Sequence, residues 1–182
     1  MSANDLERAR AQWTHRGGRR PPWAVEPGPG QESVWDYPRP PRLEPDSRVI
    51  RVSLGETPVA ETKRAVRILE TASPPTFYIP PEDVCTDLLV RSQRTSFCEW
   101  KGSATYWSLR IDGITAHDVA WSYEAPFAEL SEIRGYLSFY PDKVDCFVDG
   151  ERVRAQLGGF YGGWVTDEIV GPFKGQAGTG SW

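Results

Sequence analysis

The chain has 182 residues and a formal net charge of −4 at pH 7. The length predicts one domain with a single sizeable core, and the acidic balance argues against a nucleic-acid partner. With 17 Gly and 16 Pro we expect many turns and no long helices, and with 8 Trp, 7 Tyr and 7 Phe we expect strands. No apolar run approaches the ~20 residues that cross a bilayer, so we expect no membrane partner either.

Cysteine and histidine are scarce. Cys85, Cys98 and Cys146 are widely spaced, no CxxC pair occurs, and no signal peptide is recognisable. The pattern favours a cytoplasmic protein with reduced thiols. A closed zinc site needs about four Cys or His ligands. The three cysteines are dispersed, and His15 and His117 are the only histidines, so the sequence offers no cluster of four such ligands. We therefore predict no metal site, and we expect no other cofactor.

Residues 1–46 predict an extended arm rich in Arg, Pro and Trp. The segment lacks hydrophobic periodicity and is interrupted by Pro and Gly, apart from a short helix predicted from Leu6 to Trp13. One interpretation is a solvated tail. The other rests on Trp13, Trp23 and Trp35, because large rings are unusual in a free tail. They would dock the arm onto the domain or onto a second subunit, giving a homodimer.

Residues 47–157 predict a β domain, and residues 158–182 form a Gly-rich extension that also carries aromatic residues. Helical spacing within 126–133 predicts one short helix. The fold class is therefore mainly β with irregular Pro- and Gly-rich extensions at both ends. Outside the central hairpin, strands are predicted at 49–54, 59–62, 65–70, 76–79, 88–90, 136–140, 144–148 and 152–155, the last two joined by the turn Asp149-Gly150.

The strongest local signal is Asp112-Gly113, which stands between two alternating runs and predicts a two-residue hairpin turn. Ile111 would then pair with Ile114, and side chains would alternate between the two faces of the sheet. One face would carry Thr105, Trp107, Leu109, Ile111, Ile114, Ala116, Asp118 and Ala120, and the other Ala104, Tyr106, Ser108, Arg110, Thr115, His117, Val119, Trp121 and Tyr123.

The second face mixes aromatic rings with hydroxyls and charged groups, as ligand-binding walls do. Regular pairing places His117 opposite Ser108, which suggests a structural hydrogen bond, because no orienting acid shares their face. It also places the small Ala104 opposite Trp121, which leaves space beside that ring.

Several motifs resemble the domain-of-unknown-function 427 family. The most specific are CEWKGSATYW at residues 98–107 and AWSY at residues 120–123. Three further segments stand in the family's order: RVSLGETPVAET, LETASPPTFYIPPEDV and GYLSFYPDKVD. Together they cover Arg48 to about Asp149. Glu99 departs from the motif, since the family often has Pro there. The resemblance implies a β-tent fold, in which two antiparallel sheets meet at an angle. It implies no settled activity. Some β-tent relatives bind small ligands or peptides in an aromatic cage, and many carry zinc on paired CxxC motifs, which this chain lacks.

Catalytic motifs are weak. Some collections attach a nucleotidyltransferase label to the family, but the chain lacks both the metal-binding carboxylates and the phosphate loop of that chemistry. We therefore predict no nucleotidyl transfer. Cys98 lies near Lys101, which would favour a thiolate. A buried, inert Cys98 is the better interpretation, because free cysteines are among the most buried residues.

We therefore predict a domain that binds a small polar or amphipathic molecule. Lys101 would anchor the ligand, and Glu70 would either pair with Lys101 or accept a ligand hydrogen bond. One alternative is a transferase or hydrolase that uses Lys101 with Glu70 or His117 for acid–base work. Another is an interaction module that dimerises through its Trp-bearing ends. The candidate ligand-binding residues are Arg67, Glu70, Tyr78, Lys101, Tyr106, Ser108, His117, Trp121 and Tyr123.

Overall fold

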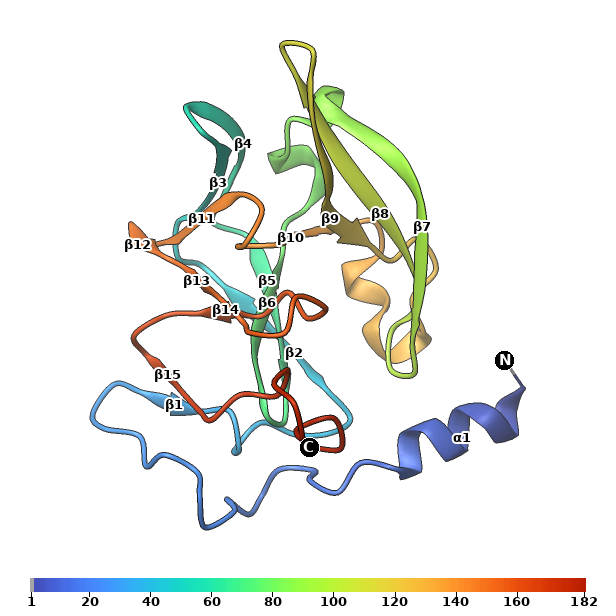
Figure 1. Cartoon of the computed structure of the whole chain (residues 1–182), viewed down its shortest axis with the longest axis vertical. Coiled ribbons are helices and arrows are strands. Elements are labelled where there is room, and N and C mark those ends of the chain that lie inside the picture. Colours follow the sequence, from blue (N-terminus) through green and yellow to red (C-terminus); the bar gives the residue numbers. More distant parts are fainter. Residues whose placement is uncertain (1) are drawn as a thin grey trace.

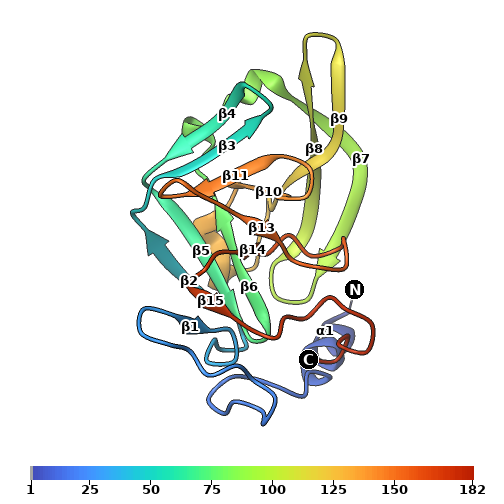
Figure 2. The ribbon, with the colours of Figure 1, turned by 60° about the vertical axis from the view of Figure 1, so that its left-hand side comes forward.

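The computed structural model describes residues 2–182 and is mainly β (Figure 1). Most strands belong to open antiparallel sheets, which confirms the predicted fold class. Two sheets have four strands each and a third has three. Seen from a second side, the long strands β7, β8 and β9 stand beside the β5–β6 ribbon, and both chain ends lie at the same end of the molecule (Figure 2).

The sheet that carries the predicted hairpin has the order β10-β9-β8-β7. Asp112 and Gly113 take positive φ angles of 50° and 81°, as a type I′ turn requires. Ile111 pairs with Ile114, so the predicted turn and its first pair are confirmed. The strands are β7 (Leu89–Cys98), β8 (Gly102–Ile111), β9 (Ile114–Ser122) and β10 (Leu137–Phe139).

A β-bulge changes the register of this hairpin farther from the turn. Pairing is regular to Leu109 with Ala116 and then shifts by two residues, so that Tyr106, not Ala104, lies opposite Trp121. Asp118 takes a positive φ of 51° in the bulge. Because the shift is even, Tyr106 and Trp121 keep the common face that alternation predicted.

The second four-stranded sheet has the order β12-β11-β3-β4. The predicted turn Asp149-Gly150 joins β11 to β12, and its residues have φ angles of 47° and 87°. The strands are β3 (Ile50–Leu54), β4 (Thr57–Thr62), β11 (Asp145–Val148) and β12 (Glu151–Arg152).

The third sheet has the order β2-β5-β6 and connects the arm to the domain, since β2 lies within residues 1–46 and pairs with β5. Two short pairs stand outside these sheets: β13 with β14, antiparallel, and β1 with β15, parallel. The strands are β1 (Glu32–Ser33), β2 (Arg42–Asp46), β5 (Ala65–Glu70), β6 (Ser73–Tyr78), β13 (Arg154–Ala155), β14 (Trp164–Val165) and β15 (Ile169–Val170).

The helices are short. α1 (Ala3–Ala11) begins earlier than predicted, because Ser2 caps it by accepting a hydrogen bond from the Asp5 amide. The helix expected within 126–133 is the 3-10 segment η3 (Ala128–Ile133), with non-helical backbone at Leu130. Two further 3-10 turns are η1 (Pro81–Asp83) and η2 (Thr86–Leu88).

The arm docks onto its own domain rather than extending as a solvated tail. Trp35 is fully buried and packs with Leu69 and Ile169, and Trp182 of the C-terminal extension joins the same cluster. Trp23 remains 52 % exposed at its edge. Trp35 and Trp182 are thus among the groups that hold the two extensions to the domain.

Candidate functional site

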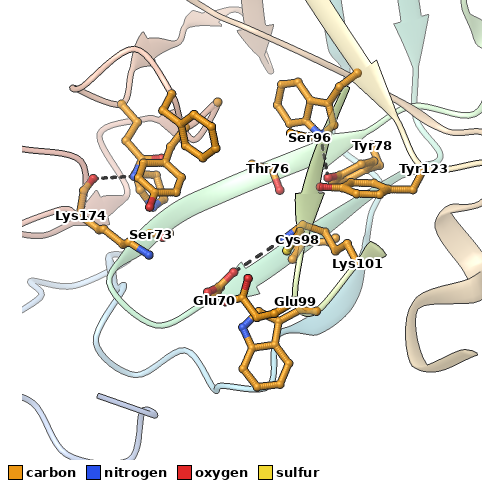
Figure 3. A pocket seen from close by; sticks show the side chains of 18 of the residues that line it. Glu70, Ser73, Thr76, Tyr78, Ser96, Cys98, Glu99, Lys101, Tyr123 and Lys174 are labelled. Carbon is orange, nitrogen blue, oxygen red and sulfur yellow. Dashed lines mark hydrogen bonds and ion pairs between the residues drawn. The ribbon is translucent and has the colours of Figure 1, made fainter. Parts of the chain in front are cut away.

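A cavity of about 170 Å³ lies between the β5–β6 ribbon and the ends of β7, β8 and β9 (Figure 3). An engineered cavity of similar size in another protein holds benzene, so this one has room for a single-ring molecule. Its lining combines aromatic rings from Trp13, Tyr78, Trp100, Tyr106, Trp121, Tyr123, Tyr140, Phe160 and Tyr161, hydroxyls from Ser73, Thr76 and Ser96, and charges from Glu70, Glu99, Lys101 and Lys174.

The hydrogen bonds of the aromatic wall are made within the wall itself. The Trp121 indole donates to the Tyr78 hydroxyl at 3.0 Å, and the Ser96 and Tyr106 hydroxyls lie 2.9 Å apart. Burial raises the pKa of Tyr78 to about 12, so this phenol is neutral at pH 7. These paired groups give the wall a fixed shape.

Two charged side chains of β5, Arg67 and Glu70, point to opposite sides of the strand. Arg67 points away from the cavity and donates to the carboxylates of Glu32 and Glu44. Glu70 points into the cavity, after a register shift between Ile68 and Glu70. The two side chains therefore face opposite ways.

Glu70 is the carboxylate partner of two buried cations. Its Oε2 lies 3.7 Å from Lys101 Nζ, and its Oε1 accepts a hydrogen bond from Arg39 Nε at 3.1 Å. Burial lowers the pKa of Lys101, but the Glu70 carboxylate beside it favours the ammonium, and that pKa lies above its ordinary value. Lys101 is therefore an ammonium ion at neutral pH, already paired inside the protein.

Cys98 lies beside Lys101 at the end of β7 and lines the same cavity. Burial raises the pKa of its thiol despite the lysine. The group is therefore protonated at neutral pH, which agrees with an inert cysteine rather than a nucleophile.

Lys174 reaches the cavity from the C-terminal extension. Its Nζ lies 3.5 Å from the ring centroid of Trp13 and 4.8 Å from that of Tyr161. No carboxylate within residues 2–182 lies within 4.0 Å of this nitrogen, although the residue is only 3 % exposed. Burial lowers the pKa of Lys174 to about 8; Glu70 opposes this shift, and the positive charge of Arg39 adds to it.

Glu99 ties the arm to the edge of the cavity. Its carboxylate accepts a hydrogen bond from the Trp13 indole at 2.6 Å, and its carbonyl accepts one from Arg10 Nε at 2.8 Å. Arg10 also lies 5.0 Å from the ring centroid of Trp100. Glu99, which departs from the family motif, thus fixes the position of the Trp13 ring at the edge of the cavity.

Six of the nine candidate residues line the cavity, and three lie elsewhere. Arg67 belongs to an ion cluster outside the cavity. Ser108 accepts a hydrogen bond from the Asp118 amide at 3.1 Å, not from His117. His117 is exposed on the bulge. The bulge interrupts the alternation that would place these last two residues beside the others. The six are Glu70, Tyr78, Lys101, Tyr106, Trp121 and Tyr123.

The predicted site did not include the walls that the two extensions supply. Trp13 comes from the arm, and Tyr161 and Lys174 come from the C-terminal extension. The only signal for them was the presence of large rings in segments without periodicity. That signal indicated docking, but it did not say where these segments dock.

Within residues 2–182, no group of three or more His, Cys, Asp and Glu side chains is placed to hold a metal ion. Among the same residues, no helix is long and apolar enough to cross a membrane. A comparison with curated proteins finds no match. A family model described as a domain of unknown function (DUF427) matches residues 42–150, more than half of the chain. The chain therefore belongs to this family.

Proposed function

We propose that the protein binds a small molecule in this cavity, and that the ligand has a planar or aromatic body and an acceptor oxygen, as a carboxylate or a carbonyl has. The aromatic walls suit the planar body, since rings favour stacked and edge-to-face contacts. The hydroxyls of Ser73, Thr76 and Ser96 supply further polar partners along the lining.

The observation that carries the proposal is the state of Lys174. Other buried cations have carboxylate partners: Arg39 and Lys101 share Glu70, and Arg67 has Glu32. The Lys174 ammonium lies against two rings and has no carboxylate partner within residues 2–182, and Figure 3 shows it directed toward Glu70 and Ser73. A buried charge without a counter-charge is costly. A ligand oxygen at this position would offset that cost.

Two parts of the chain build the cavity. Tyr78, Lys101 and Trp121 lie inside the matched range 42–150, whereas Trp13 and Lys174 lie outside it. We infer that the family domain supplies the aromatic wall, and that the two extensions supply the end that recognises the acceptor oxygen.

The test is a calorimetric titration with benzoate and with benzyl alcohol, which have similar shape and different charge. We expect benzoate to bind the wild-type protein more tightly. Lys174→Met should weaken benzoate binding by about 10- to 100-fold, the usual worth of a hydrogen bond to a charged group. The affinity for benzyl alcohol should change by less than about 3-fold.

Lys63→Met is the matched control, because Lys63 is exposed and lies outside the cavity. It removes one positive charge at a distance and should leave both affinities unchanged. If Lys174→Met and Lys63→Met weaken benzoate binding equally, the effect is one of net charge, and the proposed site is wrong. If benzoate does not bind the wild-type protein at all, the ligand class is wrong.

The enzyme alternative has less support. It required Lys101 with Glu70 or His117, yet Lys101 and Glu70 form an ion pair and His117 lies outside the cavity. An acid–base role needs a group that can exchange its proton near neutral pH. Among the lysines that line the cavity, Lys174 fits that condition and Lys101 does not.

A further inference from the structure

We propose that Lys174 is a nucleophilic amine, which condenses with an aldehyde or ketone group of a molecule in the cavity to form an imine. This inference rests on the proposed function and adds the chemical class of the reacting group. It assigns to Lys174 a covalent role, beyond that of a partner for an acceptor oxygen.

The surroundings of Lys174 are those of an activated amine. Lysines become nucleophilic when they are desolvated in an apolar pocket or placed next to another cation. The first condition holds, because two rings cover the nitrogen. Arg39 contacts the same Trp13 ring, and its positive charge lowers the pKa of Lys174 further. A pKa near 8 leaves roughly one amine in ten unprotonated at pH 7.

The backbone holds this amine in place. The Lys174 amide donates to the carbonyl of Ala72 at 2.7 Å, and the Lys174 carbonyl accepts a hydrogen bond from the Gln156 side chain at 2.6 Å. Gln156 in turn accepts a hydrogen bond from the Gly163 amide at 3.1 Å. The side chain therefore starts from a fixed point and projects into the cavity, as a positioned nucleophile must.

The reaction needs no oxidant or cofactor. The lone pair of the neutral amine forms a bond to the carbonyl carbon, and the carbonyl π electrons move to the oxygen. A proton passes from nitrogen to oxygen, giving a carbinolamine. Loss of the hydroxyl with the second amine proton releases water and leaves a carbon–nitrogen double bond. One amine and one carbonyl thus yield one imine and one water.

The other lysines provide internal controls. The chain has only four: Lys63, Lys101, Lys143 and Lys174. Lys63 is exposed, Lys101 is paired with Glu70, and Lys143 donates to the carbonyl of Asp118 at 2.9 Å. Lys174 differs from these three, because its side chain is buried among rings and has no hydrogen-bond or ion-pair partner among the residues that the structure describes.

The test is reductive methylation with limiting formaldehyde and a borane reductant at pH 7, with each lysine quantified by peptide mass spectrometry. Formaldehyde forms an imine with each amine and is small enough to enter the cavity whatever shape the natural ligand has. We expect Lys174 to be methylated at least about 10-fold faster than Lys63, because more of it is unprotonated. In 6 M urea the rates should become equal.

Saturating benzoate should slow the methylation of Lys174 and leave that of Lys63 unchanged. If Lys174 in the folded protein reacts no faster than Lys63, the imine inference is overturned, and benzoate binding that depends on Lys174 still supports the proposed function. If Lys174 reacts fast and benzoate neither binds nor protects it, the acceptor-oxygen ligand is wrong, whereas the activated amine is supported. The two failures are therefore distinguishable.

Discussion

Two charged regions lie on opposite sides of β5 and differ in how their charges are balanced. In the outer ion cluster, every cation has a carboxylate partner: Arg48 pairs with Asp46 and Glu168, and Arg67 pairs with Glu32 and Glu44. At the cavity, Glu70 pairs with Lys101, which lines it, and with Arg39, which does not, and Lys174 has no carboxylate partner among the described residues. Because each cation of the outer cluster has a carboxylate partner, these charges need no ligand. The buried cation without a carboxylate partner is the feature that supports the proposed ligand.

The largest expected effect comes from Arg39, the most fully satisfied cation. Its buried guanidinium donates to Glu70 and to the carbonyls of His15, Thr71 and Trp182. Arg39→Met leaves those acceptors buried, and we expect a loss of about 3–5 kcal/mol in the free energy of unfolding. Urea denaturation followed by tryptophan fluorescence measures it. A loss below about 1 kcal/mol would show that this cation is not structural.

Arg67→Met should cost less, about 2–3 kcal/mol in the same assay. Arg67 is buried, but the side chains of Glu32 and Glu44 are 37 % and 34 % exposed, so water can solvate them once the arginine is gone. Benzoate affinity should not change, because Arg67 lies outside the cavity. An affinity loss comparable with that of Lys174→Met would remove the contrast between the two regions.

Lys174→Met should stabilise the free protein at pH 7, by about 1–3 kcal/mol. The native pKa is about 8 and the ordinary value 10.5. Below pH 8 both states are protonated and the native state bears the full cost of the buried charge, partly offset by the rings of Trp13 and Tyr161. Between pH 8 and 10.5 the native amine has lost its proton while the unfolded chain retains it, so wild-type stability rises with pH relative to the variant.

Urea denaturation of both proteins from pH 6 to pH 11 measures this difference. The gap between Lys174→Met and wild type should be constant below pH 8 and close toward pH 10.5. A variant that is less stable than the wild type at pH 7 would mean that the ammonium has a stabilising partner, contrary to our account.

The smallest effect is expected at His117. Because His117 is exposed on the bulge, His117→Ala should change the free energy of unfolding by less than about 0.5 kcal/mol. It should leave benzoate affinity unchanged, as measured by calorimetry. A clear loss of affinity would restore the hypothesis that Lys101 works with His117.

Local sequence signals predicted the framework of the fold. The turn at Asp112-Gly113 and the strand over 65–70 depend on residues that are close in sequence, and both agree with the structure. Alternation also brought Tyr106, Trp121 and Tyr123 to one face, and all three line the cavity. Such signals can be recognised in a sequence because side chains alternate along a strand with a fixed period of two.

The rest of the site depends on contacts that no periodic pattern in the sequence indicates. The bulge at Asp118 displaced His117 from the expected face, and nothing near it in sequence marked the positive φ. Trp13 and Lys174 come from opposite ends of the chain and meet only after both extensions dock. Hydrophobic pattern specifies a face of a strand, but it does not specify where an irregular segment lies. The residue that carries the proposal was therefore absent from the predicted set.

The most direct test of the central claim is a crystal structure of the protein with saturating 4-bromobenzoate, located by the anomalous scattering of bromine. We predict bromine beside the Trp121 wall and the carboxylate about 2.8 Å from Lys174 Nζ. A cavity without bromine, or a carboxylate bound to another cation while Lys174 keeps only its aromatic contacts, would contradict the account.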